Sequence, residues 1–293
     1  MTRQVTVRVP ATTANLGPGF DSLGLALSLA EDVTVSLEGT GERDGLTRLV
    51  ADAAKAAYRL ARVETPAEIA VRSSGAGIPI GRGLGASAAA RAAGIVAADA
   101  LMGGRLDPAQ MLTLGAGLEG HADNMAPALF GGLRVVVRAG EGFAQMRAPV
   151  APGLRVVLFV PDFEMPTAES RKLLPAQLSR EDAVHNIGRA ALLVAALGAG
   201  QWDLLDAATQ DRLHQPARGK LFGAMSAIFD AAKRAGARCA YLSGAGSTVA
   251  AFALEREEEI GAAMTEAASA RGYSGRVLVT EPSEQGAQVV AMD

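Results

Sequence analysis

Residues 79–89 read Pro-Ile-Gly-Arg-Gly-Leu-Gly-Ala-Ser-Ala-Ala, and this stretch decides the fold. Three glycines at alternate positions, Gly81, Gly83 and Gly85, lead directly into an alanine-rich segment that is typical of a helix. Glycine has no Cβ, so the backbone can adopt positive φ values and approach a ligand closely. The free N–H groups and the positive dipole at the start of a helix favour a phosphate. The hydroxyl of Ser87 could reach a metal ion held by that phosphate, so the stretch predicts a nucleotide-binding loop, although an ordinary turn can have the same glycines.

The familiar phosphate-binding signatures are absent from the sequence. No G-x-x-x-x-G-K-[ST] loop occurs, because the one Gly-Lys pair, Gly219-Lys220, is followed by leucine and lacks the upstream glycine. The H-R-D and D-F-G signatures of protein kinases are also absent. The glycine-rich stretch therefore indicates a different class of nucleotide site.

Composition restricts the partners and the compartment. The chain has 293 residues, of which 49% are hydrophobic and 20% charged, as is typical of a globular protein with one large or two medium domains. A net charge of −3 provides no positive field for nucleic acid or an anionic membrane, so we expect neither partner. One cysteine, Cys239, cannot form an internal disulfide, and the N-terminus lacks the apolar core of a signal peptide. We therefore expect a cytoplasmic protein.

Hydrophobic periodicity predicts strands and helices in an irregular order, which favours an α+β arrangement over a doubly wound sheet. The predicted strands are 5–9, 33–37, 69–72, 133–138, 154–160, 239–242, 249–253 and 276–280, and the predicted helices are 47–62, 86–102, 108–118, 180–197, 217–235 and 255–271. Ser179, three residues before Asp182, predicts a cap for the helix at 180–197. The glycine- and proline-rich segment 139–153 predicts a boundary between domains 1–150 and 151–293.

Two further motifs flank the glycine-rich stretch in sequence. Residues 10–21 read Pro-Ala-Thr-Thr-Ala-Asn-Leu-Gly-Pro-Gly-Phe-Asp, and residues 243–248 read Ser-Gly-Ala-Gly-Ser-Thr. In this order and spacing, the three motifs resemble the GHMP small-molecule kinases over essentially the whole chain. The resemblance implies a two-domain α+β fold, with an N-terminal domain like ribosomal protein S5 domain 2 and a ferredoxin-like C-terminal domain. It also implies that the phosphate loop belongs to domain 1–150, and a homodimer is the family expectation.

Within the family, two segments are similar to the homoserine kinases. They are residues 10–21 and residues 121–132, which read His-Ala-Asp-Asn-Met-Ala-Pro-Ala-Leu-Phe-Gly-Gly. The resemblance implies ATP and L-homoserine as substrates and a phosphorylated side-chain hydroxyl as product, in threonine biosynthesis. Thr12 stands where the isoprenoid-precursor kinases usually have a basic residue.

Phosphoryl transfer requires in-line positioning and charge neutralisation around the γ-phosphate, with a metal that bridges phosphate oxygens. Mg²⁺ prefers hard oxygen ligands, and the resemblance implies that Ser87 and Glu119 are its catalytic ligands. It further implies that ATP is bound by the residues of the loop, namely Pro79, Ile80, Gly81, Arg82, Gly83, Leu84, Gly85, Ala86, Ser87 and Ala88.

An amino-acid substrate is a zwitterion, and the planar guanidinium of arginine can bind its carboxylate through two hydrogen bonds. The segments 167–171 and 211–218 resemble two family elements, which implies that Arg171 and Arg218 clamp the α-carboxylate. The ammonium and hydroxyl are then assigned to Asn15, Asp21, Asp123 and Asn124.

The general base stays open at this point. Asp123 is counted with the catalytic residues because it would orient the substrate, and His121 is either an oriented structural histidine or a proton acceptor. A loose, metaphosphate-like transition state does not require early deprotonation of the attacking hydroxyl.

Three positions depart from the usual family motifs: Ala86 replaces a serine, Ser247 replaces a proline and Gln215 replaces a glutamate. Two alternatives remain. One is a GHMP kinase for a sugar or an isoprenoid precursor, although a neutral sugar would have no carboxylate for a pair of carboxylate-binding arginines. The other is a nucleotide-binding regulator without turnover, which the presence of Ser87 and Glu119 disfavours.

Overall fold

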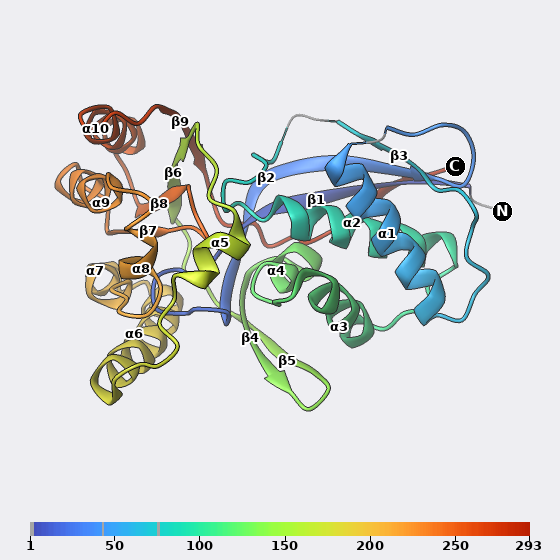
Figure 1. The fold of residues 1–293 in the computed structure, drawn as a ribbon, viewed down its shortest axis with the longest axis horizontal. Coiled ribbons are helices and arrows are strands. Elements are labelled where there is room, and N and C mark those ends of the chain that lie inside the picture. Colours follow the sequence, from blue (N-terminus) through green and yellow to red (C-terminus); the bar gives the residue numbers. More distant parts are fainter. Residues whose placement is uncertain (1–2, 43, 75–76) are drawn as a thin grey trace.

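The computed structural model describes residues 3–42, 44–74 and 77–293. Two antiparallel sheets lie side by side, each with its own helices (Figure 1). The larger sheet has the order β10-β1-β2-β4-β5, with β3 paired to β2 off this path. Its strands are β1 (Gln4–Ala14), β2 (Leu23–Ser36), β3 (Ala70–Ser73), β4 (Leu133–Ala139), β5 (Gly142–Ala148) and β10 (Gln288–Met292).

Four helices pack on the larger sheet: α1 (Gly45–Leu60), α2 (Ala86–Leu101), α3 (Pro108–Glu119) and α4 (Met125–Phe130). Helices α2 and α4 contact β1 and β2, and α1 packs on α2. Gly94 makes that packing close, because a Cβ built there would lie 2.2 Å from the carbonyl oxygen of Val50. The small alanines of α2 are buried almost throughout, so the phosphate loop that precedes this helix rests on a tightly packed base.

The smaller sheet has the order β7-β8-β6-β9, and helices α9 and α10 pack against it. Its strands are β6 (Arg155–Pro161), β7 (Cys239–Leu242), β8 (Val249–Ala253) and β9 (Gly275–Thr280). The helical segments of this half are α5 (Thr167–Lys172), α6 (Arg180–Ala199), η1 (Trp202–Leu204), α7 (Leu205–Ala208), α8 (Gln215–Arg218), α9 (Met225–Arg234) and α10 (Glu257–Ser269). The short helix α5 lies between the two halves (Figure 1).

The α+β class is confirmed, and so is the cap of α6, where the Asp182 amide donates to the Ser179 hydroxyl at 3.0 Å. The single helix predicted over 217–235 is wrong. The structure has two helices there: α8 ends at Arg218, and α9 begins at Met225. Between them the chain turns, and the side chain of Phe222 is buried in the core. A loop bounded by Gly219 and Gly223 makes this turn.

Two strands lie outside the predicted set. Strand β5 forms within the segment 139–153, where glycine and proline predicted a boundary between domains, and pairs with β4 through residues 142–148. Strand β10 pairs with β1, so the end of the chain returns to the first sheet. The boundary near residue 150 stays a prediction. Within the described parts of the chain, no helix combines the length and apolar character needed to cross a lipid bilayer.

Candidate active site

The three motifs meet between the two halves of the molecule. The amide of Thr12 in β1 donates to the Leu84 carbonyl at 3.1 Å, and the amide of Thr248 donates to the Arg82 carbonyl at 3.0 Å. The amide of Gly244 donates to the carbonyl of Ala14 at 3.0 Å. The phosphate loop is thus held by backbone hydrogen bonds on both sides, from β1 and from the third motif.

The glycines of the loop have the geometry that the sequence predicts. Gly81, Gly83 and Gly85 have φ values of +67°, +77° and +72°, in the left-handed region that side chains disfavour. Space also excludes a side chain, because a Cβ on Gly83 would lie 2.2 Å from the Ser243 carbonyl oxygen, and one on Gly85 would lie 1.9 Å from the Thr12 hydroxyl. Helix α2 begins directly after Gly85, so its free N–H groups follow the turn.

A cavity of about 390 Å³ opens beside this turn. The predicted site residues that line it are Asn15, Asp21, Pro79, Ile80, Gly81, Gly83, Leu84, Gly85, Ala86, Ser87, Glu119, Asp123, Asn124, Arg171 and Arg218. Arg82 and Ala88 lie outside its lining. Arg82 instead donates to the carbonyls of Pro161 and Asp162 at 2.8 Å, which ties the loop to the end of β6, and Ala88 is fully buried within α2.

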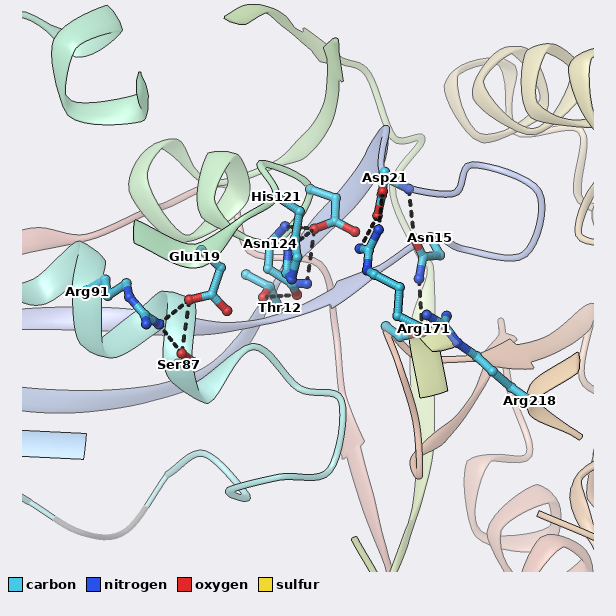
Figure 2. A network of polar contacts seen from close by, with 12 residues as sticks. Thr12, Asn15, Asp21, Ser87, Arg91, Glu119, His121, Asn124, Arg171 and Arg218 are labelled. Atoms are coloured by element: carbon cyan, nitrogen blue, oxygen red, sulfur yellow. Dashed lines mark hydrogen bonds and ion pairs between the residues drawn. The ribbon is translucent and has the colours of Figure 1, made fainter. Parts of the chain in front are cut away.

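One end of the cavity carries oxygen ligands. The Ser87 hydroxyl, in the first turn of α2, donates to Oε2 of Glu119 at 2.9 Å. A guanidinium nitrogen of Arg91, one turn further along α2, contacts both the hydroxyl and this carboxylate oxygen (Figure 2). A hydroxyl and a carboxylate are hard donors of the kind that Mg²⁺ prefers, so the residues present fit this metal.

At the other end, Arg171 and Asp21 form a two-pronged ion pair, with both N–O distances at 2.8 Å. The Asp21 amide donates to the side-chain oxygen of Asn15 at 3.0 Å, and the Asn15 side-chain amide donates to the Gly244 carbonyl at 2.9 Å (Figure 2). Asn15 and Asp21 have φ values of +67° and +55°. Such values cost energy in residues other than glycine and often mark functional sites.

Arg218 lies beside this pair and is buried. One of its terminal nitrogens donates to the Gly244 carbonyl and to Nδ1 of His214, both at 2.9 Å. Burial first, and the charge of Arg171 second, lower the pKa of Arg218 to about 10, so it remains a cation at neutral pH. The guanidinium carbons of Arg171 and Arg218 lie 5.2 and 5.5 Å from the ring centre of Phe20. The cavity therefore holds a desolvated positive charge suited to a carboxylate.

His214 fixes this arginine through its two ring nitrogens. Its Nε2 lies 2.7 Å from the carbonyl oxygen of Gly17, which can only accept, so Nε2 carries the proton and Nδ1 accepts from Arg218. Burial lowers the pKa of His214 to about 4, and Asp211 opposes that shift. The histidine is thus neutral at physiological pH.

Because of His214, we expect the free energy of unfolding to fall as the solution becomes acidic. The folded protein binds this proton more weakly than the unfolded chain does. The stabilisation is therefore full above 6.5, the ordinary pKa of a histidine, and is lost as pH falls toward about 4. The loss would amount to about 3 kcal/mol of unfolding free energy. Urea unfolding between pH 7 and pH 4 should show a steeper decline for the wild type than for His214→Gln. Parallel declines would contradict the assignment. His185→Gln, on α6, is the comparison: burial lowers the pKa of His185 as well, but by less, so its removal should flatten the decline less than removal of His214.

Asp123 lines the cavity, and one of its carboxylate oxygens is already engaged. Its Oδ1 accepts from the Asn124 amide at 2.8 Å and lies 2.9 Å from Nδ1 of His121. Burial disfavours the charged imidazole, yet the hydrogen bond and charge of Asp123 outweigh it, so the pKa of His121 is raised. The hydroxyl of Thr12 fixes Asn124 by donating to its side-chain oxygen at 2.8 Å. Asp123 and Asn124 are thus held in defined orientations.

The departures from the family motifs have local explanations. The Gln215 side-chain oxygen accepts from the Leu242 amide at 2.7 Å, and the Ser247 hydroxyl donates to the Phe163 carbonyl at 2.6 Å. The first contact ties α8 to the end of β7, and the second ties the third motif to the segment that follows β6. Ala86 lines the cavity without offering an oxygen.

Sequence reasoning did not assign Arg91, Phe20 or a role for His214 in holding Arg218. The spacing of four residues between Ser87 and Arg91 was an available signal, because residues four apart share one face of a helix. The same spacing relates His214 to Arg218. Phe20 lies within the first motif and carried no separate signal.

Comparison with known proteins agrees with this architecture. Residues 48–132 match the GHMP kinases N terminal domain, and residues 193–270 match the family described as GHMP kinases C terminal. The homoserine kinase of Moorella thermoacetica is 42% identical, over 97% of this chain and 99% of its own. The homoserine kinase of Thermus thermophilus is also 42% identical, over 92% of this chain and 94% of its own.

Solved structures agree. The crystal structure of homoserine kinase from Cytophaga hutchinsonii superposes with a TM-score of 0.87 at 29% identity, covering 99% of this chain and 98% of that one. Mevalonate diphosphate decarboxylase from Staphylococcus aureus superposes with a TM-score of 0.70 at 12% identity, covering 99% of each chain, which shows a shared fold alone. The chain belongs to the GHMP kinase family.

Proposed function

We propose that the protein transfers the γ-phosphoryl group of ATP to the side-chain hydroxyl of L-homoserine, giving ADP and O-phospho-L-homoserine, a step of threonine biosynthesis. The observation that carries this proposal is one cavity with two unlike ends. A glycine loop and a pair of hard oxygen donors lie at one end, and two arginines that face Phe20 lie at the other. The names of the full-length relatives support the same reaction.

At the phosphate end, the glycine loop and the first turn of α2 would bind the phosphates of ATP through backbone N–H groups. Ser87 and Glu119 would hold Mg²⁺, because their oxygens lie 2.9 Å apart and face the same cavity. When bound, the metal neutralises negative charge on the phosphate oxygens. Arg82 would act indirectly, by fixing the loop against β6.

At the amino-acid end, opposite charges lie next to each other in the pattern of a zwitterion. Arg218 and Arg171 would bind the α-carboxylate, and Asp21 would accept hydrogen bonds from the α-ammonium. Asn15 would keep Asp21 in its left-handed conformation through the hydrogen bond to the Asp21 amide. A neutral sugar would leave the buried guanidinium group of Arg218 without an anionic partner, which is costly.

Between the two ends, Asp123 and Asn124 would orient the substrate hydroxyl for in-line attack. Oδ1 of Asp123 is engaged by His121 and the Asn124 amide, so Oδ2 is the atom that would accept a hydrogen bond from the hydroxyl. In a loose transition state the proton leaves late, and positioning supplies most of the rate. No residue is therefore assigned as an obligatory base.

We place this reaction in the cytoplasm. The one cysteine of the chain, Cys239, is buried and free, and burial raises the pKa of its thiol to about 12. Such a thiol is inert and suits a reducing compartment.

The test measures the release of ADP from Mg-ATP in the presence of one candidate acceptor at a time: L-homoserine, D-homoserine, L-serine, mevalonate or galactose. The proposal predicts turnover largely confined to L-homoserine, because in this panel only this compound presents the carboxylate, ammonium and hydroxyl with both the required spacing and the L configuration. Preferential turnover of galactose would retain a kinase but refute the assignment of the arginines. Preferential turnover of mevalonate, which has a carboxylate but no ammonium group, would refute the ammonium site assigned to Asp21. ATP binding without turnover of any compound would favour a regulator.

A further inference from the structure

We propose that Arg91 is a built-in counter-cation for Glu119, which keeps a free divalent metal ion out of the Ser87–Glu119 site until the nucleotide arrives. The inference rests on the proposed function, because it assumes that a metal enters this site together with ATP.

The fold brings three groups to one point. Ser87 and Arg91 lie four residues apart on α2 and therefore share one face of that helix. Glu119 is the last residue of α3 and reaches the same face from the side. Figure 2 shows the guanidinium of Arg91 directed at the Ser87 hydroxyl and the Glu119 carboxylate, in contact with both.

The ion pair is shielded from water, since the side chains of Arg91 and Glu119 are 17% and 12% exposed. Charges in such surroundings interact more strongly than charges on the surface. A divalent cation bound to the same oxygens would lie next to the guanidinium, and the two positive charges would repel each other. Free metal can therefore bind here only if Arg91 first gives up its carboxylate partner.

The other arginines near the loop and cavity are engaged elsewhere. Arg82 is held by carbonyls at the end of β6, Arg171 by Asp21, and Arg218 by His214 and the Gly244 carbonyl. Arg91 is thus the cation in contact with Ser87 and Glu119. The phosphates of ATP bring enough negative charge to satisfy both this guanidinium and a metal ion, which removes the repulsion. The site then accepts the metal with the nucleotide and excludes it alone.

Ala86 strengthens this conclusion. It lines the cavity directly before Ser87 and has no side-chain oxygen, so this position offers a free metal no ligand. Fewer protein ligands make the affinity more dependent on the oxygens of the nucleotide.

The test is a titration of the nucleotide-free protein with Mn²⁺, in which the electron paramagnetic resonance signal of the unbound ion measures how much metal the protein has bound. We expect weak binding by the wild type and at least tenfold tighter binding by Arg91→Met, which keeps much of the length but removes the charge. Arg91→Lys should bind as weakly as the wild type, and Arg212→Met, which removes a surface arginine paired with Glu181 and Asp182, is the control that should not tighten binding. With a non-hydrolysable ATP analogue present, wild type and Arg91→Met should differ by less than threefold.

A second readout is the melting temperature. Without metal, Arg91→Met should melt below the wild type, because Glu119 loses its partner. Mn²⁺ at one fixed concentration should raise the melting temperature of the variant and leave that of the wild type unchanged. If Arg91→Met does not fold, Arg91→Gln carries the same expectations. The inference would be overturned if the uncharged variant, without nucleotide, bound Mn²⁺ no more tightly than the wild type does. Turnover of L-homoserine by the wild type is measured separately, so failure of the proposed function would be seen independently.

Discussion

Glu119→Gln should lower kcat by about a thousandfold, because it removes the anionic oxygen that would neutralise charge at the phosphate end of the cavity. Glutamine has nearly the same shape, so the Ser87 hydroxyl keeps a hydrogen-bond acceptor and the loop keeps its position. The KM for L-homoserine should change little, because the arginines and Asp21 lie at the opposite end of the cavity (Figure 2). Steady-state kinetics with saturating ATP at several Mg²⁺ concentrations measure both quantities.

Glu266→Gln, on the exposed surface of α10, is the matched control and should behave as the wild type. Loss of activity in Glu119→Gln that excess Mg²⁺ partly restores would support the metal role. A kcat within threefold of the wild type would remove Glu119 from the catalytic residues and leave it as the partner of Arg91 alone.

Arg218→Met should raise the KM for L-homoserine by about a hundredfold and leave the KM for ATP nearly unchanged. Removing one partner of a buried, hydrogen-bonded charge pair costs about 2–5 kcal/mol. The effect of Arg171→Met should be smaller, because the Arg171 side chain is 40% exposed and solvent screens its charge. Initial rates measured over a grid of both substrate concentrations separate the two KM values.

The surface variant Arg212→Met breaks exposed ion pairs with Glu181 and Asp182 and should leave both constants unchanged. An equal rise in the KM for ATP and for L-homoserine in Arg218→Met would indicate general damage to the site. Unfolding curves for each variant show whether the substitution acts on binding or on stability.

The phosphate loop could be predicted from sequence because its requirements are local. At Gly83 the backbone has φ at +77° and passes so close to the Ser243 carbonyl that only glycine fits. The glycines at alternate positions of the sequence therefore predicted the turn. The alanine-rich sequence after the loop likewise predicted helix α2. Motif resemblance then selected residues as distant as Asp21 and Arg171, which lie 150 positions apart and form one ion pair.

The rest depended on tertiary contacts that no local pattern encodes. Arg91 looks like an ordinary helical arginine until α3 places Glu119 beside it. Burial keeps His214 neutral, and the carbonyl of Gly17, far away in the sequence, orients the ring by accepting from its Nε2. Strand β10 is exposed along its whole length and therefore lacks the alternation that marks a half-buried strand. Its place at the edge of the first sheet comes from pairing with β1.

The most direct test of the proposed reaction is phosphorus NMR of the protein incubated with Mg-ATP and L-homoserine. The structure predicts a phosphomonoester whose phosphorus couples to two methylene protons, as expected for a phosphate on the side-chain oxygen, formed in step with ADP. Inorganic phosphate as the one product besides ADP, or a phosphorus bonded to the carboxylate or amino group, would contradict it.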